Sequence, residues 1–284
     1  MNINKILILV GLSLMPFLSV QAKETNNLTL PKIQVVPIKD TQANRLYELY
    51  IKLPDGYDKN SDKTYPVIYF TDAMVHVEII SATTEFLMEE AILVGISWQK
   101  DIDEDFKKKH GAHASRYRDF SMRKSSDPER QAKYRFGQAS NHIDFIRNNV
   151  IKTVEKNYRA DPNNRTYFGY SMGAKFGAYI LMGQPETFKN YILGSPGLNG
   201  DIPLLLKAGA NSPLKDKGLN ANVFISYGSK EDRLGKHVEE FVAKLKDRKD
   251  KSLSIKHVVI EGSHKTAFPM TSLRSVTWLA DLAK

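Results

Sequence analysis

Short apolar runs alternate with segments whose apolar residues recur every three or four positions along most of this chain. Continuous β-branched and aromatic runs predict buried strands, and the helical spacing predicts amphipathic helices. Strands are predicted at 44–53, 67–70, 92–96, 166–168, 191–193, 223–226 and 254–260. Helices are predicted at 143–158 (capped by Ser140), 174–182, 236–248 and 272–282. The alternation predicts an α/β fold with a doubly wound, mostly parallel sheet and an antiparallel N-terminal hairpin.

Residues 98–135 depart from this alternation, because they are polar, strongly charged and poor in apolar periodicity. A segment of this length without core residues is typical of a lid or binding loop. Its lysines and arginines make it basic, although a solvated surface excursion would have the same composition. His110 and His113 lie in it at a chelating spacing, but no carboxylate cluster accompanies them and we expect no metal site.

Residues 1–22 have the pattern of a secretory signal peptide, with Lys5 before an apolar run and Val-Gln-Ala as a cleavage site. The run is short for a membrane span and Pro16 interrupts it, so we expect no stable membrane anchor after cleavage. Residues 23–284 are expected to form one domain in a bacterial periplasm or outside the cell. Cysteine is absent, which excludes disulfides, thiolate metal sites and a cysteine nucleophile.

The net charge is +9 at pH 7, and removal of Lys5 with residues 1–22 leaves +8. Such a surplus favours anionic ligands or surfaces. No zinc-finger spacing, RNA-binding aromatic signature or heptad pattern accompanies it, so nucleic acid is not an expected partner. We expect a small-molecule ligand, and the charge is suited to an anionic one.

Gly169-Tyr170-Ser171-Met172-Gly173 reads Gly-x-Ser-x-Gly between a predicted strand and a predicted helix. A nucleophile elbow requires this context, because its serine occupies strained backbone and its neighbours must be small. The strain exposes the hydroxyl, and the helix N-terminus behind it offers amides to a developing oxyanion. An ordinary glycine-rich turn is the alternative. Ser171 is the predicted nucleophile, and the amide of Met172 is a predicted oxyanion donor.

A serine nucleophile needs a base and an acid that orients it, which in this fold follow in the order Ser, acid, His. Two adjacent carboxylates, Glu231 and Asp232, follow the strand 223–226, and either satisfies the pattern. His264 follows the next strand at the same edge of the sheet and is the predicted base. The second oxyanion amide is expected from the loop after 67–70, at Ala73 or Met74.

These residues resemble the esterase D-like branch of the α/β-hydrolases, which includes enterochelin and salmochelin esterases, feruloyl esterases and mycolyl transferases. The resemblance covers most of residues 23–284. Residues 53–57 and 65–70 are similar to its opening strands, and residues 71–74 to its oxyanion loop. Residues 118–120 resemble its Arg-Asp-Phe stretch, and residues 169–173 match its nucleophile motif. The chain departs from the family at Tyr170 for His, Ala174 for Gly, Ala73 for Gly and residues 121–122 for Thr-Pro.

The resemblance implies an α/β-hydrolase fold with residues 98–135 as its lid-like insertion. It favours Glu231 over Asp232 through a Gly-x-x-Glu motif at 228–231, although some relatives work with a Ser-His dyad. It also places Asp72, Arg118 and Tyr170 near the substrate.

We therefore expect a serine carboxylic-ester hydrolase that works through an acyl-enzyme on Ser171, with His264 as base, Glu231 as orienting acid and the amides of Met172 and Met74 as oxyanion hole. No cofactor is required. Two alternatives use the same site: a siderophore trilactone esterase and an acyltransferase to an alcohol. A third belongs to another class, a catalytically silent relative that binds an anionic ligand.

Overall fold

The computed structural model of the protein describes residues 32–59 and 61–282, and these are built around one eight-stranded sheet. The predicted signal peptide, 1–22, lies outside the described residues. The strands are β1 (Ile33–Asp40), β2 (Arg45–Lys52), β3 (Tyr65–Thr71), β4 (Ile92–Ile96), β5 (Ala160–Tyr170), β6 (Asn190–Gly194), β7 (Ala221–Gly228) and β8 (Leu253–Ile260). Their order in space is β1-β2-β4-β3-β5-β6-β7-β8.

The sheet is antiparallel only at its N-terminal edge, where β1 pairs with β2 and β2 with β4. The remaining neighbours are parallel, from β4 through to β8. The predicted α/β fold, with its mostly parallel sheet and antiparallel N-terminal hairpin, is therefore confirmed. Because parallel strands end at one edge, the loops after β3, β5, β6, β7 and β8 share an edge of the sheet, where such folds place their sites.

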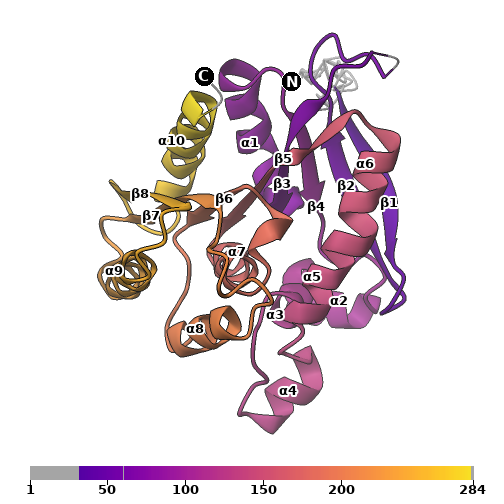
Figure 1. Ribbon diagram of the computed structural model, residues 1–284. Coiled ribbons are helices and arrows are strands. Elements are labelled where there is room, and N and C mark those ends of the chain that lie inside the picture. The colour runs from indigo at the N-terminus through magenta and orange to yellow at the C-terminus, as the bar shows by residue number, and fades with distance from the viewer. Residues whose placement is uncertain (1–31, 60, 283–284) are drawn as a thin grey trace, which may run out of the picture. The chain divides into compact units, whose positions relative to one another are not determined.

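Helices cover both faces of the sheet (Figure 1). The α-helices are α1 (Ala73–Leu87), α2 (Glu104–His110), α3 (Arg116–Asp119), α4 (Pro128–Tyr134), α5 (Ala139–Phe145), α6 (Lys152–Asn157), α7 (Met172–Gly183), α8 (Ile202–Ala210), α9 (Asp232–Asp247) and α10 (Ala267–Leu282). The other helical segments are η1 (Ala112–Ser115), η2 (Ile146–Ile151), which is a π-helix, and η3 (Pro185–Thr187). In the described residues no helix is both long and apolar enough to cross a membrane.

Alternate residues of the central strands enter two hydrophobic cores, as the two-residue period of a strand requires. Phe168 and Ile192 lie with α1 and α10 in one core. Tyr167 and Leu193 lie in the other, with helices α5 to α9. The segment predicted as one helix over 143–158 is built from α5, η2 and α6, and it begins at Ala139 after Gln138. The prediction that Ser140 caps this helix was wrong, because Ser140 lies inside its first turn.

Residues 98–135 fold as the short elements α2, η1, α3 and α4 rather than as an irregular loop. Only part of the segment is solvated: Ala114, Asp119 and Phe120 are buried, and Phe120 belongs to the larger core. Phe120 stacks on Phe176 of α7 with ring centroids 5.2 Å apart. His110 and His113 pack against aromatic rings, including those of Tyr134 and Trp98. The segment thus packs against α7, the helix that follows the predicted nucleophile turn.

Candidate active site

Ser171 occupies the single residue between β5 and α7, with φ 55° and ψ −115°. A left-handed φ is costly for a residue with a side chain, so the surrounding structure must hold it. Its N–H donates to the carbonyl of Gly194 at 2.8 Å, and its carbonyl accepts from the N–H of Lys175 at 3.0 Å. These bonds tie the turn to the end of β6 on one side and to the first turn of α7 on the other.

The two glycines of the motif are required by close packing. A Cβ on Gly169 would lie 2.5 Å from the backbone of Gly173, where strand and helix meet. A Cβ on Gly173 would lie 2.4 Å from Oγ1 of Thr71, at the end of β3. Any side chain at either position would push the helix away from the sheet. The motif therefore has the packing that its sequence context predicts for a nucleophile elbow.

His264 lies in the loop after β8, and its Nδ1 is 2.6 Å from Oε1 of Glu231. Glu231 follows β7, and the side chain is only 6% exposed. Its other oxygen, Oε2, accepts from the N–H of Gly228 at 2.6 Å and from the hydroxyl of Ser195 at 2.7 Å. The neighbouring Asp232 is exposed and begins α9. Of the two carboxylates that the sequence left open, Glu231 is the one that contacts the histidine.

The contact between His264 and Glu231 determines which nitrogen of the His264 ring is available to accept a proton. A carboxylate at Nδ1 favours a proton on that nitrogen, which leaves Nε2 free to accept one. Ser171 and His264 are not hydrogen bonded to each other within residues 32–59 and 61–282. Catalytic hydrogen bonds of this kind commonly tighten only in the complex with substrate.

Tyr170 stands at the end of β5, immediately before Ser171, and packs behind the histidine. Its hydroxyl donates to the backbone carbonyl of His264 at 2.7 Å, and the two ring centroids are 5.3 Å apart. Burial raises the pKa of Tyr170 to about 12, so the phenol stays protonated near neutral pH. The family motif has His at this position. In this chain Tyr170 contacts the loop that carries His264. Its predicted contact with substrate stays a prediction.

The predicted oxyanion loop is the β3–α1 connection. Asp72 precedes α1 in left-handed backbone (φ 59°), and its carbonyl accepts from the N–H groups of Val75 and His76. The amides of Ala73 and Met74 belong to the first turn of α1, where backbone donors have no partner within the helix. Met172 begins α7 in the same way after the adjacent strand β5. Two helix N-termini therefore lie at the carboxyl ends of neighbouring strands, and both favour negative charge.

The Asp72 side chain is fully engaged within the protein. Arg116 contributes two contacts, Nε at 2.7 Å from Oδ1 and Nη2 at 2.9 Å from Oδ2, and Trp98 Nε1 donates to Oδ1 at 2.6 Å. The carboxylate is 1% exposed. Asp72 therefore joins the β3–α1 connection to Trp98 and Arg116, and its predicted contact with substrate stays a prediction.

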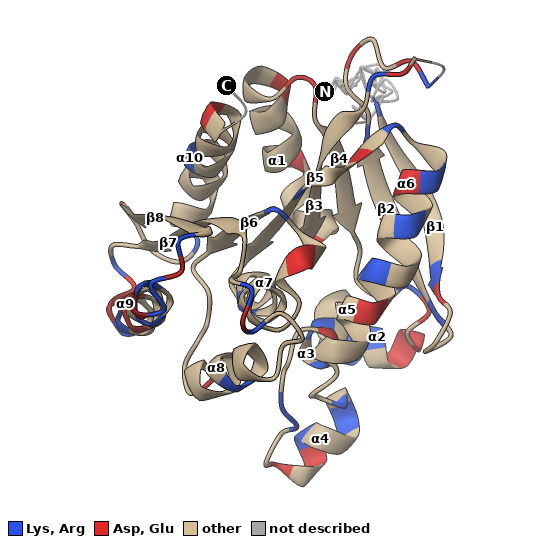
Figure 2. Ribbon diagram, viewed as in Figure 1, with Lys and Arg blue, Asp and Glu red and all other residues tan. Residues whose placement is uncertain are grey.

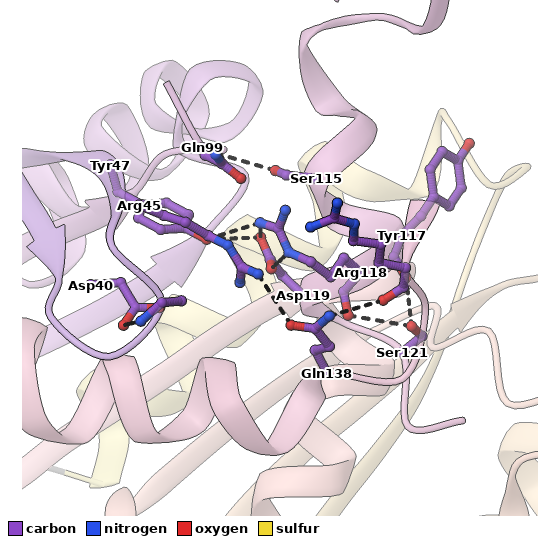
Figure 3. A network of polar contacts seen from close by, with 12 residues as sticks. Asp40, Arg45, Tyr47, Gln99, Ser115, Tyr117, Arg118, Asp119, Ser121 and Gln138 are labelled. Carbon is purple, nitrogen blue, oxygen red and sulfur yellow. Dashed lines mark hydrogen bonds and ion pairs between the residues drawn. The ribbon is translucent and has the colours of Figure 1, made fainter. Parts of the chain in front are cut away.

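Arg118 lies in a different polar network (Figure 3). Its guanidinium contacts both carboxylate oxygens of Asp119, at 2.7 and 3.1 Å, and donates to the hydroxyl of Tyr47 on β2 at 3.2 Å. Only 11% of the Arg118 side chain is exposed. No contact brings it to Ser171 in the described chain, so the network anchors residues 98–135 to the sheet. Arg116, which the sequence reasoning counted only toward the basic charge of the segment, contacts Asp72 instead. The predicted contact of Arg118 with substrate stays a prediction.

A cavity of about 440 Å³ opens beside Met172, the residue after the predicted nucleophile. Its charged lining consists of Arg123, Lys124, Arg130, Lys175 and Asp201. Basic residues mark the segment between α3 and α4 as well as α4 itself (Figure 2). Asp201 is the one acid among these five and is paired with both Arg123 and Lys175. The cavity therefore carries a surplus of positive charge, contributed largely by the segment predicted as a lid.

A comparison with protein-family models matches residues 41–268 to the family described as "Putative esterase". The chain belongs to this esterase family. The resemblance to an esterase family that the sequence motifs indicated is therefore confirmed.

Among curated proteins, the chain is similar to the ferri-bacillibactin esterase BesA of Bacillus subtilis, with 29% identity over 199 residues. The alignment covers 64% of this chain and 64% of the curated relative's own length. Among solved structures, the BES protein from Bacillus cereus has a TM-score of 0.75 and 22% identity, over 90% of this chain and 99% of that one. An IroE-like serine hydrolase from Shewanella oneidensis has a TM-score of 0.71 and 19% identity, over 88% and 80%. Both structural matches support the α/β-hydrolase type of fold.

Ser195 is a second polar residue near this site that the sequence reasoning missed, beside Arg116. It follows β6 directly, between the strand that ends at Tyr170 and the strand that ends at Gly228. A polar residue immediately after a buried apolar strand was the available signal. The pattern gave no reason to connect it with Glu231, which lies 36 positions further along the chain.

Proposed function

We propose that this protein is a serine carboxylic-ester hydrolase that uses Ser171 as nucleophile, His264 as general base and Glu231 as orienting acid. The observation that carries the proposal is the buried Glu231 held against Nδ1 of His264, at the sheet edge where the strained Ser171 also lies. An esterase-family chain with this arrangement has the parts that acyl transfer requires.

In the proposed first half-reaction, Ser171 Oγ attacks the ester carbonyl carbon while Nε2 of His264 accepts the hydroxyl proton. The carbonyl oxygen becomes an oxyanion and is stabilised by the N–H groups of Met172 and Met74. The tetrahedral intermediate collapses as the bond to the alcohol oxygen breaks, and His264 returns the proton to that oxygen. Glu231 accepts the Nδ1–H bond throughout and stabilises the imidazolium while it exists.

In the second half-reaction, water takes the place of the alcohol. His264 removes a proton from the water, whose oxygen attacks the acyl-enzyme carbonyl. The second intermediate collapses as the bond between the acyl carbon and Ser171 Oγ breaks, and His264 returns the proton to Oγ, which releases the acid and restores the Ser171 hydroxyl. Every proton that moves is held by His264 or by the reactants, so this chemistry is complete with the side chains named.

The experiment that tests the proposal compares hydrolysis of p-nitrophenyl acetate and butyrate by wild type and Ser171→Ala. Release of nitrophenol by wild type and its loss in the variant, with unchanged thermal unfolding, is the expected result. Equal activity in the two proteins would mean that Ser171 is not the nucleophile. If wild type does not act on these esters or on a panel of lactones, the ester hydrolase proposal is wrong.

An anionic ester is the substrate class that the cavity beside Met172 favours. Three of its cations are supplied by residues 123–130 and one by α7, against a single acid. The named relative BesA is a ferri-bacillibactin esterase, which makes siderophore lactones the first natural substrates to test. Chromatographic detection of linear hydroxy acids from such lactones, with Ser171→Ala as the blank, would support this narrower assignment. Hydrolysis of neutral esters alone would contradict it.

A further inference from the structure

Ser195 occupies an unusual position directly after β6. It is completely buried, its backbone is left-handed with φ 43°, and its N–H donates to the carbonyl of Ser226 at 2.7 Å. A serine in this conformation is strained, and such residues persist where the surrounding structure requires them. Gly194, just before it, pairs with Tyr170 across the β5–β6 ladder and accepts the N–H of Ser171. The strain therefore lies next to the nucleophile turn.

The Ser195 hydroxyl has two oxygen neighbours and one proton to give. Oε2 of Glu231 is 2.7 Å away, and the hydroxyl oxygen of Tyr170 is 3.0 Å away. An ionised carboxylate is the stronger acceptor and the shorter contact, so the proton belongs to the bond with Glu231. Tyr170 uses its own proton on the carbonyl of His264. The Ser195 hydroxyl thus donates to Glu231, and the Tyr170 hydroxyl donates to the backbone of His264.

We infer that Ser195 is a positioning residue of the proposed reaction: it holds the Glu231 carboxylate in the rotation that presents Oε1 to His264. The inference rests on the proposed function, in which Glu231 acts through His264. Nothing in the geometry brings Ser195 to the substrate, because it is buried behind the carboxylate.

The bonds to Glu231 show why one hydroxyl matters. Among residues 32–59 and 61–282, Oε2 accepts from two groups, the Ser195 hydroxyl and the N–H of Gly228, while Oε1 faces His264. Without the Ser195 hydroxyl, Oε2 keeps one donor. A buried carboxylate with too few donors is destabilised, so rotation toward another donor becomes favourable. The carboxylate then turns, and the imidazole that it orients loses its fixed direction. Because imidazolium forms only as Ser171 attacks, the loss falls on kcat and not on KM.

Packing around Tyr170 supports the same assignment. A Cβ on Gly194 would lie 2.5 Å from Cδ2 of Tyr170, so the glycine makes room for the ring that contacts Ser195 and His264 together. The contact between Tyr170 and Ser195 therefore depends on the absence of a side chain at Gly194.

The test measures kcat and KM on p-nitrophenyl butyrate for Ser195→Ala, Glu231→Gln and the double variant. We expect Ser195→Ala to lower kcat about tenfold with KM within about twofold, as removal of a bond to a charged group predicts. In the Glu231→Gln background the same change should lower kcat less than about twofold, because the group through which Ser195 acts is already lost. Independent losses that multiply in the double variant would overturn the inference.

Ser226→Ala is the matched control. Ser226 is also fully buried, within the neighbouring strand β7, and among the described residues its hydroxyl pairs with that of Thr271 and is not hydrogen bonded to Glu231 or His264. It should lose a similar amount of stability and keep kcat. Equal kcat losses in both variants would show that Ser195 is only structural. If Ser195→Ala does not fold, Ser195→Cys, which keeps the volume with a weaker donor, takes its place in the same cycle.

The outcome separates this inference from the proposed function. Wild type that hydrolyses the ester, with Ser171→Ala inactive and Ser195→Ala unchanged, overturns the role of Ser195 alone. Inactive wild type overturns the proposed function and, with it, this inference.

Discussion

His264 Nδ1 lies 2.6 Å from Oε1 of Glu231, whereas the adjacent carboxylate of Asp232 is exposed at the start of α9. Glu231 and Asp232 are adjacent in the chain, yet the Glu231 side chain is buried with three hydrogen-bond donors and Asp232 is exposed to solvent. This relationship makes the two carboxylates a natural pair for comparison.

Glu231→Gln should lower kcat on p-nitrophenyl esters by roughly a hundredfold or more, because an amide at this position holds the imidazole in the wrong tautomer. Asp232→Asn should change kcat less than about twofold, since Asp232 is exposed at the start of α9. Steady-state kinetics of both variants make the measurement. A Glu231→Gln enzyme as active as wild type would indicate that Ser171 and His264 work as a dyad.

Gly173→Ala should destabilise the protein and reduce activity together. The added Cβ would lie 2.4 Å from Thr71 Oγ1 and 3.3 Å from Oδ2 of Asp72, so α7 must shift away from β3 and the oxyanion loop. Overpacking of this kind costs about 1–3 kcal/mol. The measurement is the midpoint of thermal unfolding beside kcat.

Gly183→Ala, at the other end of α7, is the control for Gly173→Ala. A Cβ there meets only the Cβ of Ala208, at 3.8 Å, which is ordinary contact. Alanine is a better helix former than glycine by about 0.8–1 kcal/mol, so this variant should be as stable as wild type or more stable, with unchanged kcat. Equal destabilisation by both substitutions would argue against close packing at the nucleophile turn as the cause.

Arg116→Gln and Arg118→Gln should differ in activity although both lose an ion pair. Each leaves a buried carboxylate, Asp72 or Asp119, without its cation, which costs about 3–5 kcal/mol in buried pairs. Asp72 begins the loop that supplies the proposed oxyanion amides, whereas Asp119 faces Tyr47. We expect Arg116→Gln to lower kcat about tenfold and Arg118→Gln to leave it within about twofold, in conditions where both are folded. The reverse order would support the prediction that Arg118 is the arginine of the site.

The sequence predicted those parts of the fold that local pattern determines. The runs at 67–70, 92–96 and 223–226 became central strands, because a strand buried on both faces must be apolar throughout. The Gly-x-Ser-x-Gly turn was recognisable because its pattern is complete within five positions, although the close approach that requires Gly173 comes from Thr71 on β3. The start of strand β5 was not predicted. The strand begins at Ala160, but its first half is polar and gave no strand pattern, and it is held in the sheet by pairing with β3.

The residues that sequence reasoning missed depend on contacts between distant segments. Ser195 meets Glu231 only because β6 and β7 are neighbours, and Arg116 meets Asp72 only because residues 98–135 fold back over the β3–α1 loop. The placement of Arg118 shows the same limit. A charged side chain in a polar segment gave no sign that it would be buried against Tyr47.

Stability should fall as the pH falls below about 6.5, in part because of His142. This histidine is buried among aromatic rings, with Phe176 and Phe145 at 5.4 and 5.5 Å. Burial lowers its pKa below the ordinary 6.5, and the attraction of Asp119 offsets only part of that effect. The unfolded chain therefore binds a proton in a range of pH where the folded chain does not. The stability contributed by the neutral ring is present above 6.5 and is lost as the pH falls through the lower folded-state pKa.

His142→Phe should reduce this pH dependence. We expect the fall in unfolding midpoint between about pH 7.5 and about pH 5.5 to be smaller in the variant than in wild type, whatever its midpoint at neutral pH. Because burial also lowers the pKa of His76, part of the dependence should survive in His142→Phe. Parallel curves for wild type and His142→Phe would contradict the assignment.

Salt should affect hydrolysis of anionic esters more than hydrolysis of neutral ones, because the cavity beside Met172 carries unbalanced positive charge. In the part of the chain that the structure describes, Lys124 and Arg130 of this cavity form no ion pair, so their charges are available to a ligand. We expect kcat/KM for an acetoxybenzoate to fall several-fold more steeply than that for phenyl acetate between about 50 and about 500 mM salt. Lys124→Gln with Arg130→Gln should remove most of this difference, whereas Lys244→Gln, an exposed lysine on α9, should not. Equal salt dependence of the two esters in wild type would mean that this cavity does not select the charge of the substrate.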